Sequence, residues 1–98
     1  MMATLPPERA VGVVIEGRVQ GVGFRNWAQR IARQLGLVGW VRNRQNGTVE
    51  AVFAGSTGMV EEMLARCRNG PRSARVDRLD VCDVPAPVMV DFEVHEDD

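Results

Sequence analysis

Residues 11–25 have the sequence VGVVIEGRVQGVGFR, and the order of its parts decides the fold. Large apolar residues alternate with other residues from Val11 to Glu16, which is the two-residue period of a strand with one buried face. The strand ends near Val19, and the glycines at 21 and 23 allow a tight backbone turn. Apolar residues then recur in steps of three and four, at positions 24, 27, 28, 31 and 35. The sequence therefore predicts a strand, a glycine-rich turn and a helix with one apolar face, in direct succession.

A β-hairpin follows this first unit. Gly36 supplies the left-handed residue that commonly ends a helix. Residues 37–43 and 48–54 are rich in strand-forming residues, and they flank Asn46-Gly47, the strongest short-range hairpin signal. We therefore expect a second and a third strand that pair in antiparallel fashion.

A second helix and further strands complete the chain. Ser56 or Thr57 can cap the helix, and Asn69-Gly70-Pro71 ends it. Its apolar stripe consists of Val60, Met63, Leu64 and Cys67. Residues 74–83 are expected to form a fourth strand, and the alternation of Val88, Val90, Phe92 and Val94 predicts a fifth.

The element order is βαββαβ with one appended strand, which predicts an α+β sandwich of ferredoxin-like type with both helices on one face of the sheet. The expected strand order is 4-1-3-2 with a short fifth strand at the edge, because a right-handed crossover makes strands one and two parallel and places strand three between them. Their C-terminal ends then share one edge of the sheet. Two strand spacings put the turn at residues 20–24 about 10 Å from Asn43.

Length and composition predict one domain spanning residues 1–98, with residues 1–9 as a flexible leader and 96–98 as a solvated acidic tail. The formal net charge is -1, so no basic field indicates nucleic acid as a partner. A membrane partner is not expected either, because the longest apolar run falls far short of the roughly 20 residues of a membrane span. Two cysteines without metal-ligand spacing favour a reducing cytoplasm. We expect a cytoplasmic monomer.

The turn from Gln20 to Arg25 is a candidate anion site. It joins a strand to a helix N-terminus, where free backbone N–H groups and the helix dipole favour a negative charge. A guanidinium at position 25 can bind two phosphate oxygens at once. Two glycines alone would more often serve only the turn, but Arg25 at the helix entrance favours anion binding. The dinucleotide and nucleoside-triphosphate motifs do not fit, so a small phosphate is the expected ligand.

Asn43 is the candidate partner of a water molecule at this site. No cysteine, serine, histidine or aspartate stands beside Arg25, so a covalent phosphoenzyme is not expected and water must be the attacking group. A carboxamide cannot act as a base, but it can both donate to a water and accept from it, which fixes the water in place. Taken alone, an asparagine before a hairpin turn is more often a turn former.

Two stretches resemble the signatures of one family. The first is residues 15–25, IEGRVQGVGFR, which is similar to the acylphosphatase signature G-x-V-Q-G-V-x-F-R. The second is Gly39-Trp40-Val41-Arg42-Asn43, with Gly47, Val49 and Gly55 at the expected offsets. The resemblance continues through Gly70-Pro71 and residues 74–77 to residues 92–94, so it covers nearly everything except the leader and the tail.

The resemblance implies a ferredoxin-like fold and hydrolysis of the carboxyl-phosphate bond of a small acyl phosphate, without a metal or an organic cofactor. It implies that Arg25 binds the phosphate and that Asn43 orients the water. The backbone N–H groups of the loop Gln20, Gly21, Val22, Gly23 and Phe24 would complete the binding site for the substrate. An acyl phosphate expels a carboxylate whose acid has a pKa near 4, so no protein general acid is required.

The sequence is also compatible with two other kinds of protein. One is a binding module without catalysis, either for a small anion or for RNA on the sheet face. The RNA version expects exposed aromatic and basic residues on the central strands, which residues 48–53 do not supply. Another is a resemblance to the acylphosphatase-like domain at the start of larger carbamoyl-transferring proteins, although a chain of this length has no room for their remaining domains.

Overall fold

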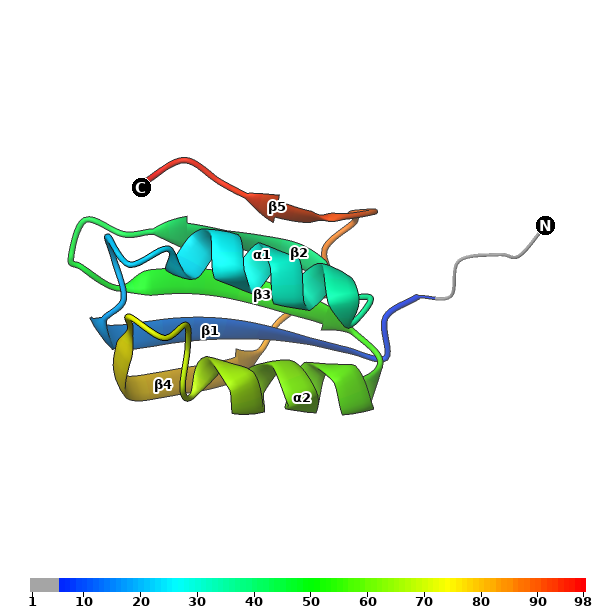
Figure 1. Ribbon diagram of the computed structural model, residues 1–98. Helices are drawn as coiled ribbons and strands as arrows, with labels where there is room; N and C mark the ends of the chain where they lie inside the picture. The colour runs from blue at the N-terminus through cyan, green and yellow to red at the C-terminus, as the bar shows by residue number, and fades with distance from the viewer. Residues whose placement is uncertain (1–5) are drawn as a thin grey trace.

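The computed structural model describes residues 6–98, which form a five-stranded sheet covered on one face by two helices (Figure 1). The elements are β1 (Arg9–Arg18), α1 (Phe24–Gln34), β2 (Val38–Asn43), β3 (Val49–Gly55), α2 (Thr57–Cys67), β4 (Arg75–Asp83) and β5 (Phe92–Val94). Their order across the sheet is β4-β1-β3-β2-β5. The ferredoxin-like βαββαβ arrangement and the strand order expected from the sequence are thus confirmed.

The central strands have the predicted period of two. In β1, Val11, Val13 and Ile15 are buried, and they lie opposite Phe53, Ala51 and Val49 of the antiparallel neighbour β3. β2 also pairs with β3 in antiparallel fashion, so β1 and β2 are parallel to each other. Their C-terminal ends therefore lie at the same end of the sheet, as the crossover argument requires.

The helices cover the inner face of the sheet with the stripes that the sequence predicts. α1 buries Phe24, Ala28, Ile31 and Ala32, and α2 buries Val60, Met63, Leu64 and Cys67. Ser56 is the cap of α2, because its hydroxyl oxygen accepts a hydrogen bond from the Met59 N–H at 3.3 Å. Desolvation in this core raises the pKa of the Cys67 thiol to about 12.

β5 is shorter than the alternation predicts. Only residues 92–94 form a strand, which pairs in parallel with residues 39–41 of β2, so the sheet is mixed rather than purely antiparallel. Val88 and Val90 were expected to continue this strand, but both are fully exposed in the loop before it. The expectation is wrong there, because residues 85–90 pair with no strand.

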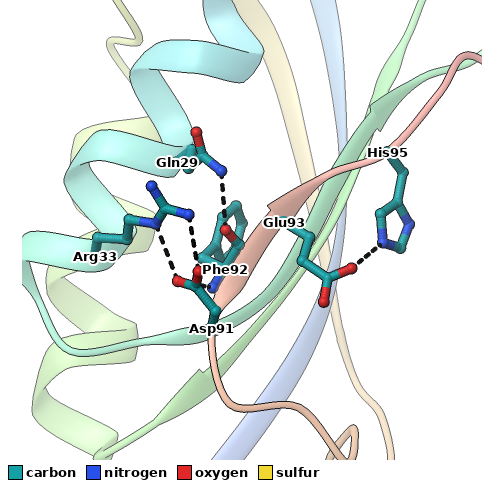
Figure 2. A network of polar contacts seen from close by, with 6 residues as sticks. All are labelled: Gln29, Arg33, Asp91, Phe92, Glu93 and His95. Atoms are coloured by element: carbon teal, nitrogen blue, oxygen red, sulfur yellow. Dashed lines mark hydrogen bonds and ion pairs between the residues drawn. The ribbon is translucent and has the colours of Figure 1, made fainter.

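Polar contacts with α1 hold β5 in its place beside β2 (Figure 2). The Gln29 amide donates to the Phe92 carbonyl oxygen at 3.0 Å, and the Arg33 guanidinium donates to both oxygens of the Asp91 carboxylate at 3.0 and 2.8 Å. The hydrogen bonds from Arg33, together with one from the Phe92 N–H, lower the pKa of the Asp91 carboxyl. This anchoring fixes the path of the chain that continues beyond Val94.

The N-terminal segment joins the sheet earlier than the sequence suggests. Residues 1–9 were expected to form a flexible leader, yet β1 already begins at Arg9. The Glu8 N–H donates to the Gly55 carbonyl oxygen at 3.0 Å, and the Glu8 carboxylate accepts from the Thr57 N–H at 3.0 Å. From Glu8 onward this segment is therefore part of the fold, while residues 1–5 lie outside the described residues.

Candidate active site

A hollow of about 110 Å³ lies where the C-terminal end of β1, the N-terminus of α1 and the end of β2 meet. Its lining consists of Val19, Gly21, Gly23, Phe24, Arg25, Asn26 and Asn43. Figure 1 shows the β1–α1 loop and the β2–β3 turn at the same end of the molecule, opposite the described start of the chain. The volume is several times the roughly 30 Å³ of a water molecule, so a small anion and a water fit.

The loop at residues 20–24 ends in an uncapped helix. Gly21 and Gly23 have left-handed backbones, with φ of 72° and 79°, and Gly23 is the N-cap of α1. No side chain caps this helix, and its first turn contains no acidic residue. The first backbone N–H groups of α1 are therefore available to an anion, and the helix dipole favours one there.

Asn43 supplies the opposite wall of the hollow. It is the last residue of β2, paired with Val49 across the hairpin, and only 9% of it is exposed. Within residues 6–98 it is the only buried polar or charged residue. None of the side-chain hydrogen bonds in this range involves its carboxamide, and the one fully buried side-chain N or O atom without a partner is Arg44 Nε. Its two neighbours point elsewhere: Arg42 is paired with Glu50 at 2.9 Å, and Arg44 Nε lies 3.8 Å from an Asp98 carboxylate oxygen. The Asn43 carboxamide can therefore bind a ligand or a water in the hollow.

Arg25 enters the hollow from the first turn of α1, and the acidic tail meets it there. Arg25 Nη1 donates to Asp97 Oδ1 at 2.8 Å. Residues 96–98 are exposed, in line with the solvated tail expected from the sequence, but Asp97 also forms this ion pair with Arg25. The chain follows β2 beyond β5, with the His95 N–H donating to the Val41 carbonyl oxygen and the Asp98 N–H donating to that of Asn43, both at 2.9 Å. The parallel pairing of β5 with β2 thus carries the tail to the hollow.

The structure gathers most but not all of the residues expected at the site. Arg25, Asn43, Gly21, Gly23 and Phe24 line the hollow together, whereas Gln20 and Val22 do not. The Gln20 side chain points to the β2–β3 turn, where its Nε2 group donates to the carbonyl oxygens of residues 44 and 48 at 2.7 and 2.8 Å. Asp97 is a residue of the site that the sequence did not predict. The sequence feature that points to it is the acidic run at residues 96–98, which directly follows the strand at residues 92–94.

Other side chains that could react lie outside the hollow. His95, the only histidine of the sequence, stacks on Trp40 with ring centroids 5.3 Å apart and lies 3.0 Å from a Glu93 carboxylate oxygen. Cys82 is exposed on β4, whereas Cys67 is buried in α2. Across residues 6–98, no three His, Cys, Asp or Glu side chains gather as a metal site would require. None of the helices in this range is long and apolar enough to span a membrane.

The chain is similar to known proteins over nearly its whole length. The family model "Acylphosphatase" matches residues 11–94. An acylphosphatase of Rhizorhabdus wittichii is 51% identical over 90 residues, which cover 92% of this chain and 91% of the relative. The structure of an acylphosphatase from Coxiella burnetii superimposes with a TM-score of 0.87 at 31% identity, over 91% of this chain and 94% of that one.

A longer protein contains the same fold as a small part. The crystal structure of full-length HypF in its phosphate- and nucleotide-bound form matches with a TM-score of 0.86 at 26% identity, over 99% of this chain but only 13% of that chain. The Rhizorhabdus and Coxiella proteins instead match over most of their own length. Sequence, fold and extent of the match agree, and the chain belongs to the acylphosphatase family.

Proposed function

We propose that this acylphosphatase hydrolyses small acyl phosphates by in-line attack of one water on a phosphoryl group held in the hollow. One observation carries the proposal. The uncapped N-terminus of α1, Arg25 and the largely buried Asn43 line the same cavity of about 110 Å³. A cation with peptide dipoles stabilises the transferring group, and a fixed amide positions the nucleophile.

The phosphate cradle, as we name it, consists of Arg25 and the backbone N–H groups of Gln20, Gly21, Val22, Gly23 and Phe24. Peptide N–H groups at a helix start and a guanidinium bind the phosphoryl oxygens and stabilise their charge. The left-handed glycines at 21 and 23 support this role, because they turn the chain so that it enters α1 beside the hollow.

The reaction needs no acid from the protein. The oxygen of the attacking water forms a bond to phosphorus while the bond between phosphorus and the acyl oxygen breaks, and the carboxylate leaves with the electron pair. A proton of the water passes to a phosphoryl oxygen, which gives dihydrogen phosphate. The leaving carboxylate is stable unprotonated at pH 7, since its acid has a pKa near 4. The role of Asn43 is to hold the water opposite the leaving oxygen.

The remaining properties belong to the same proposal. We expect a monomer that acts in the cytoplasm on a small-molecule acyl phosphate and uses neither metal nor organic cofactor. The balanced charge, 12 basic against 13 acidic residues, supports the expectation that nucleic acid is not a partner.

The test is hydrolysis of benzoyl phosphate by the purified protein, with a chelator present and inorganic phosphate as a competitor. Arg25→Ala is expected to lower kcat/KM by about a thousand-fold or more and to abolish competition by phosphate. Asn43→Ala is expected to lower kcat by about a hundred-fold with a weaker effect on phosphate binding. Arg30→Ala is the matched control, because Arg30 is an exposed arginine on the same helix. Hydrolysis that survives both site substitutions would refute the mechanism.

A further inference from the structure

The Gln20 side chain joins the two halves of the candidate site. Gln20 begins the loop that contains the phosphate cradle, and its Nε2 group donates to the carbonyl oxygens of Arg44 at 2.7 Å and Thr48 at 2.8 Å. These two residues form the base of the β2–β3 turn, where the Arg44 N–H also donates to the Thr48 carbonyl oxygen at 2.9 Å. A single partly buried amide thus connects segments that are 24 and 28 residues apart.

The contact requires a neutral amide of this length. A primary amide has two N–H donors, and here both are used on carbonyl oxygens of one turn. A glutamate carboxylate has the same size but no N–H group, so it would place an acceptor oxygen against two carbonyl oxygens that also only accept. An apolar side chain would leave two partly buried carbonyls without this donor, which is unfavourable. The bridge is therefore specific to glutamine rather than to any side chain that fills the space.

The bridge acts next to Asn43. Arg44 directly follows Asn43, whose own backbone is fixed by pairing with Val49. The bond from Gln20 to the Arg44 carbonyl oxygen therefore controls where the end of β2 lies relative to the loop. Gln20 is absent from the lining of the hollow, so its side chain acts on the site through neighbouring residues and not on a ligand.

We propose that Gln20 is a positioning residue, whose carboxamide sets the separation between the phosphate cradle and the water-holding Asn43. This inference rests on the proposed function above. Small errors in the placement of a reacting group are costly, since a displacement of about 1 Å can lower a rate by about a hundred-fold. The two hydrogen bonds of Gln20 thus hold the loop and the β2–β3 turn, which are far apart in the sequence, at a fixed distance from each other.

The test compares kcat with phosphate binding in Gln20→Met, Gln20→Glu and a matched control. Both variants are expected to lower kcat by about ten-fold or more, while the inhibition constant of inorganic phosphate changes by less than about two-fold, because the phosphate cradle is unaltered. Methionine is unbranched and similar in volume, so it keeps the packing and loses only the donors. Gln29→Met is the control, since its Nε2 group makes a comparable bond to the Phe92 carbonyl oxygen, at 3.0 Å, away from the hollow. The control is expected to keep its kcat.

A double variant separates positioning from general structure. In an Asn43→Ala background, Gln20→Met is expected to lower kcat by less than about two-fold, because the residue it positions is already gone. An equal fall of kcat with and without Asn43, or the same fall in Gln29→Met, overturns the inference. An unchanged kcat in Gln20→Met, together with a lowered kcat in Asn43→Ala, also overturns the positioning role of Gln20. This second result leaves the proposed function intact. Full activity of Asn43→Ala would instead overturn the proposed role of Asn43.

Discussion

Arg25 Nη1 lies 2.8 Å from Asp97 Oδ1, so a carboxylate of the same chain occupies one N–H group of the guanidinium assigned to the phosphate. The two residues are 72 positions apart and meet because β5 runs parallel to β2 and carries the chain toward the hollow. About a third of the Arg25 side chain and nearly two thirds of that of Asp97 are exposed, so water and salt screen the pair. A phosphate must therefore compete with Asp97 for one N–H group of Arg25.

Asp97→Asn is expected to strengthen phosphate binding. Removing the competing charge lowers the KM for benzoyl phosphate and the inhibition constant of inorganic phosphate by about two- to five-fold, the range that a screened ion pair supports. Steady-state kinetics at low and high salt measure the effect, which shrinks as salt rises.

Glu96→Gln is the matched control for Asp97→Asn, because it removes one charge from the neighbouring exposed residue. It is expected to change the inhibition constant of phosphate by much less. If Asp97→Asn instead weakens phosphate binding, the carboxylate holds Arg25 in place rather than competing for it.

Gly39 and Gly58 are expected to respond in opposite ways to replacement by alanine. A Cβ at Gly39 would overlap the Val52 carbonyl oxygen of the neighbouring strand, and its φ of 139° is strained for any other residue. Gly39→Ala is therefore expected to lower the free energy of unfolding by about 3 kcal/mol or more. Gly58 lies in α2 with open space around its Cβ position, so Gly58→Ala is expected to raise the free energy of unfolding by about 0.5 kcal/mol. Urea unfolding measures both, and equal effects would contradict the structure.

The Cys67 thiol is expected to make the protein less stable at high pH. Burial raises its pKa from 9.0 to about 12, so between these values the folded chain holds a proton that the unfolded chain has lost. Stability is then fully present below about pH 9 and falls as pH rises toward 12. The sequence has no lysine and no tyrosine, so few other groups titrate in this window. Urea midpoints across the window measure the fall, and a flat profile would contradict it.

Thiol labelling gives an independent check of the same burial. Exposed Cys82 is expected to react with a thiol reagent at pH 8 and buried Cys67 only in denaturant. Equal reaction of both thiols in the folded protein would contradict the buried position of Cys67.

Asp91→Asn is expected to lower stability at pH 7 but not in acid. Arg33 and then the Phe92 N–H lower the pKa of the Asp91 carboxyl, so its contribution is present above the ordinary value of 3.8 and is lost as pH falls through the lowered pKa. Asparagine can still accept from the Phe92 N–H, so the variant isolates the ion pair with Arg33. The difference in urea midpoint should shrink as pH falls below 3.8, and a difference that stays constant with falling pH would contradict this account.

Most of the fold could be predicted from local signals. The period of two in β1, the turn glycines and the stripe of α1 are all contained in neighbouring residues, and Asn46-Gly47 fixes the hairpin. The extent of β5 could not be predicted in this way. Val88 and Val90 have the same alternation as Phe92 and Val94, but pairing with β2 includes only residues 92–94. Which part of an alternating run finds a partner depends on tertiary structure, not on the run itself.

The candidate site, too, could be predicted only in part. The loop and Asn43 could be placed together, because the topology brings the ends of β1 and β2 to one edge of the sheet. The contacts of Asp97 with Arg25 and of Gln20 with Arg44 could not be predicted. Each joins residues far apart in the sequence, and a pattern of neighbouring residues does not show which distant residues meet. An acidic run and a loop glutamine are typical of solvated surfaces, so their composition gives no indication of these partners.

Gly21 and Gly23 place a particular kind of constraint on the loop. A Cβ at either position would touch nothing within 4 Å, so the requirement is for a positive φ and not for space. The loop requires a left-handed backbone conformation at these two positions, which L-residues other than glycine disfavour. Asparagine, which tolerates this conformation best, is therefore the mildest replacement at either position, and valine or isoleucine the most damaging.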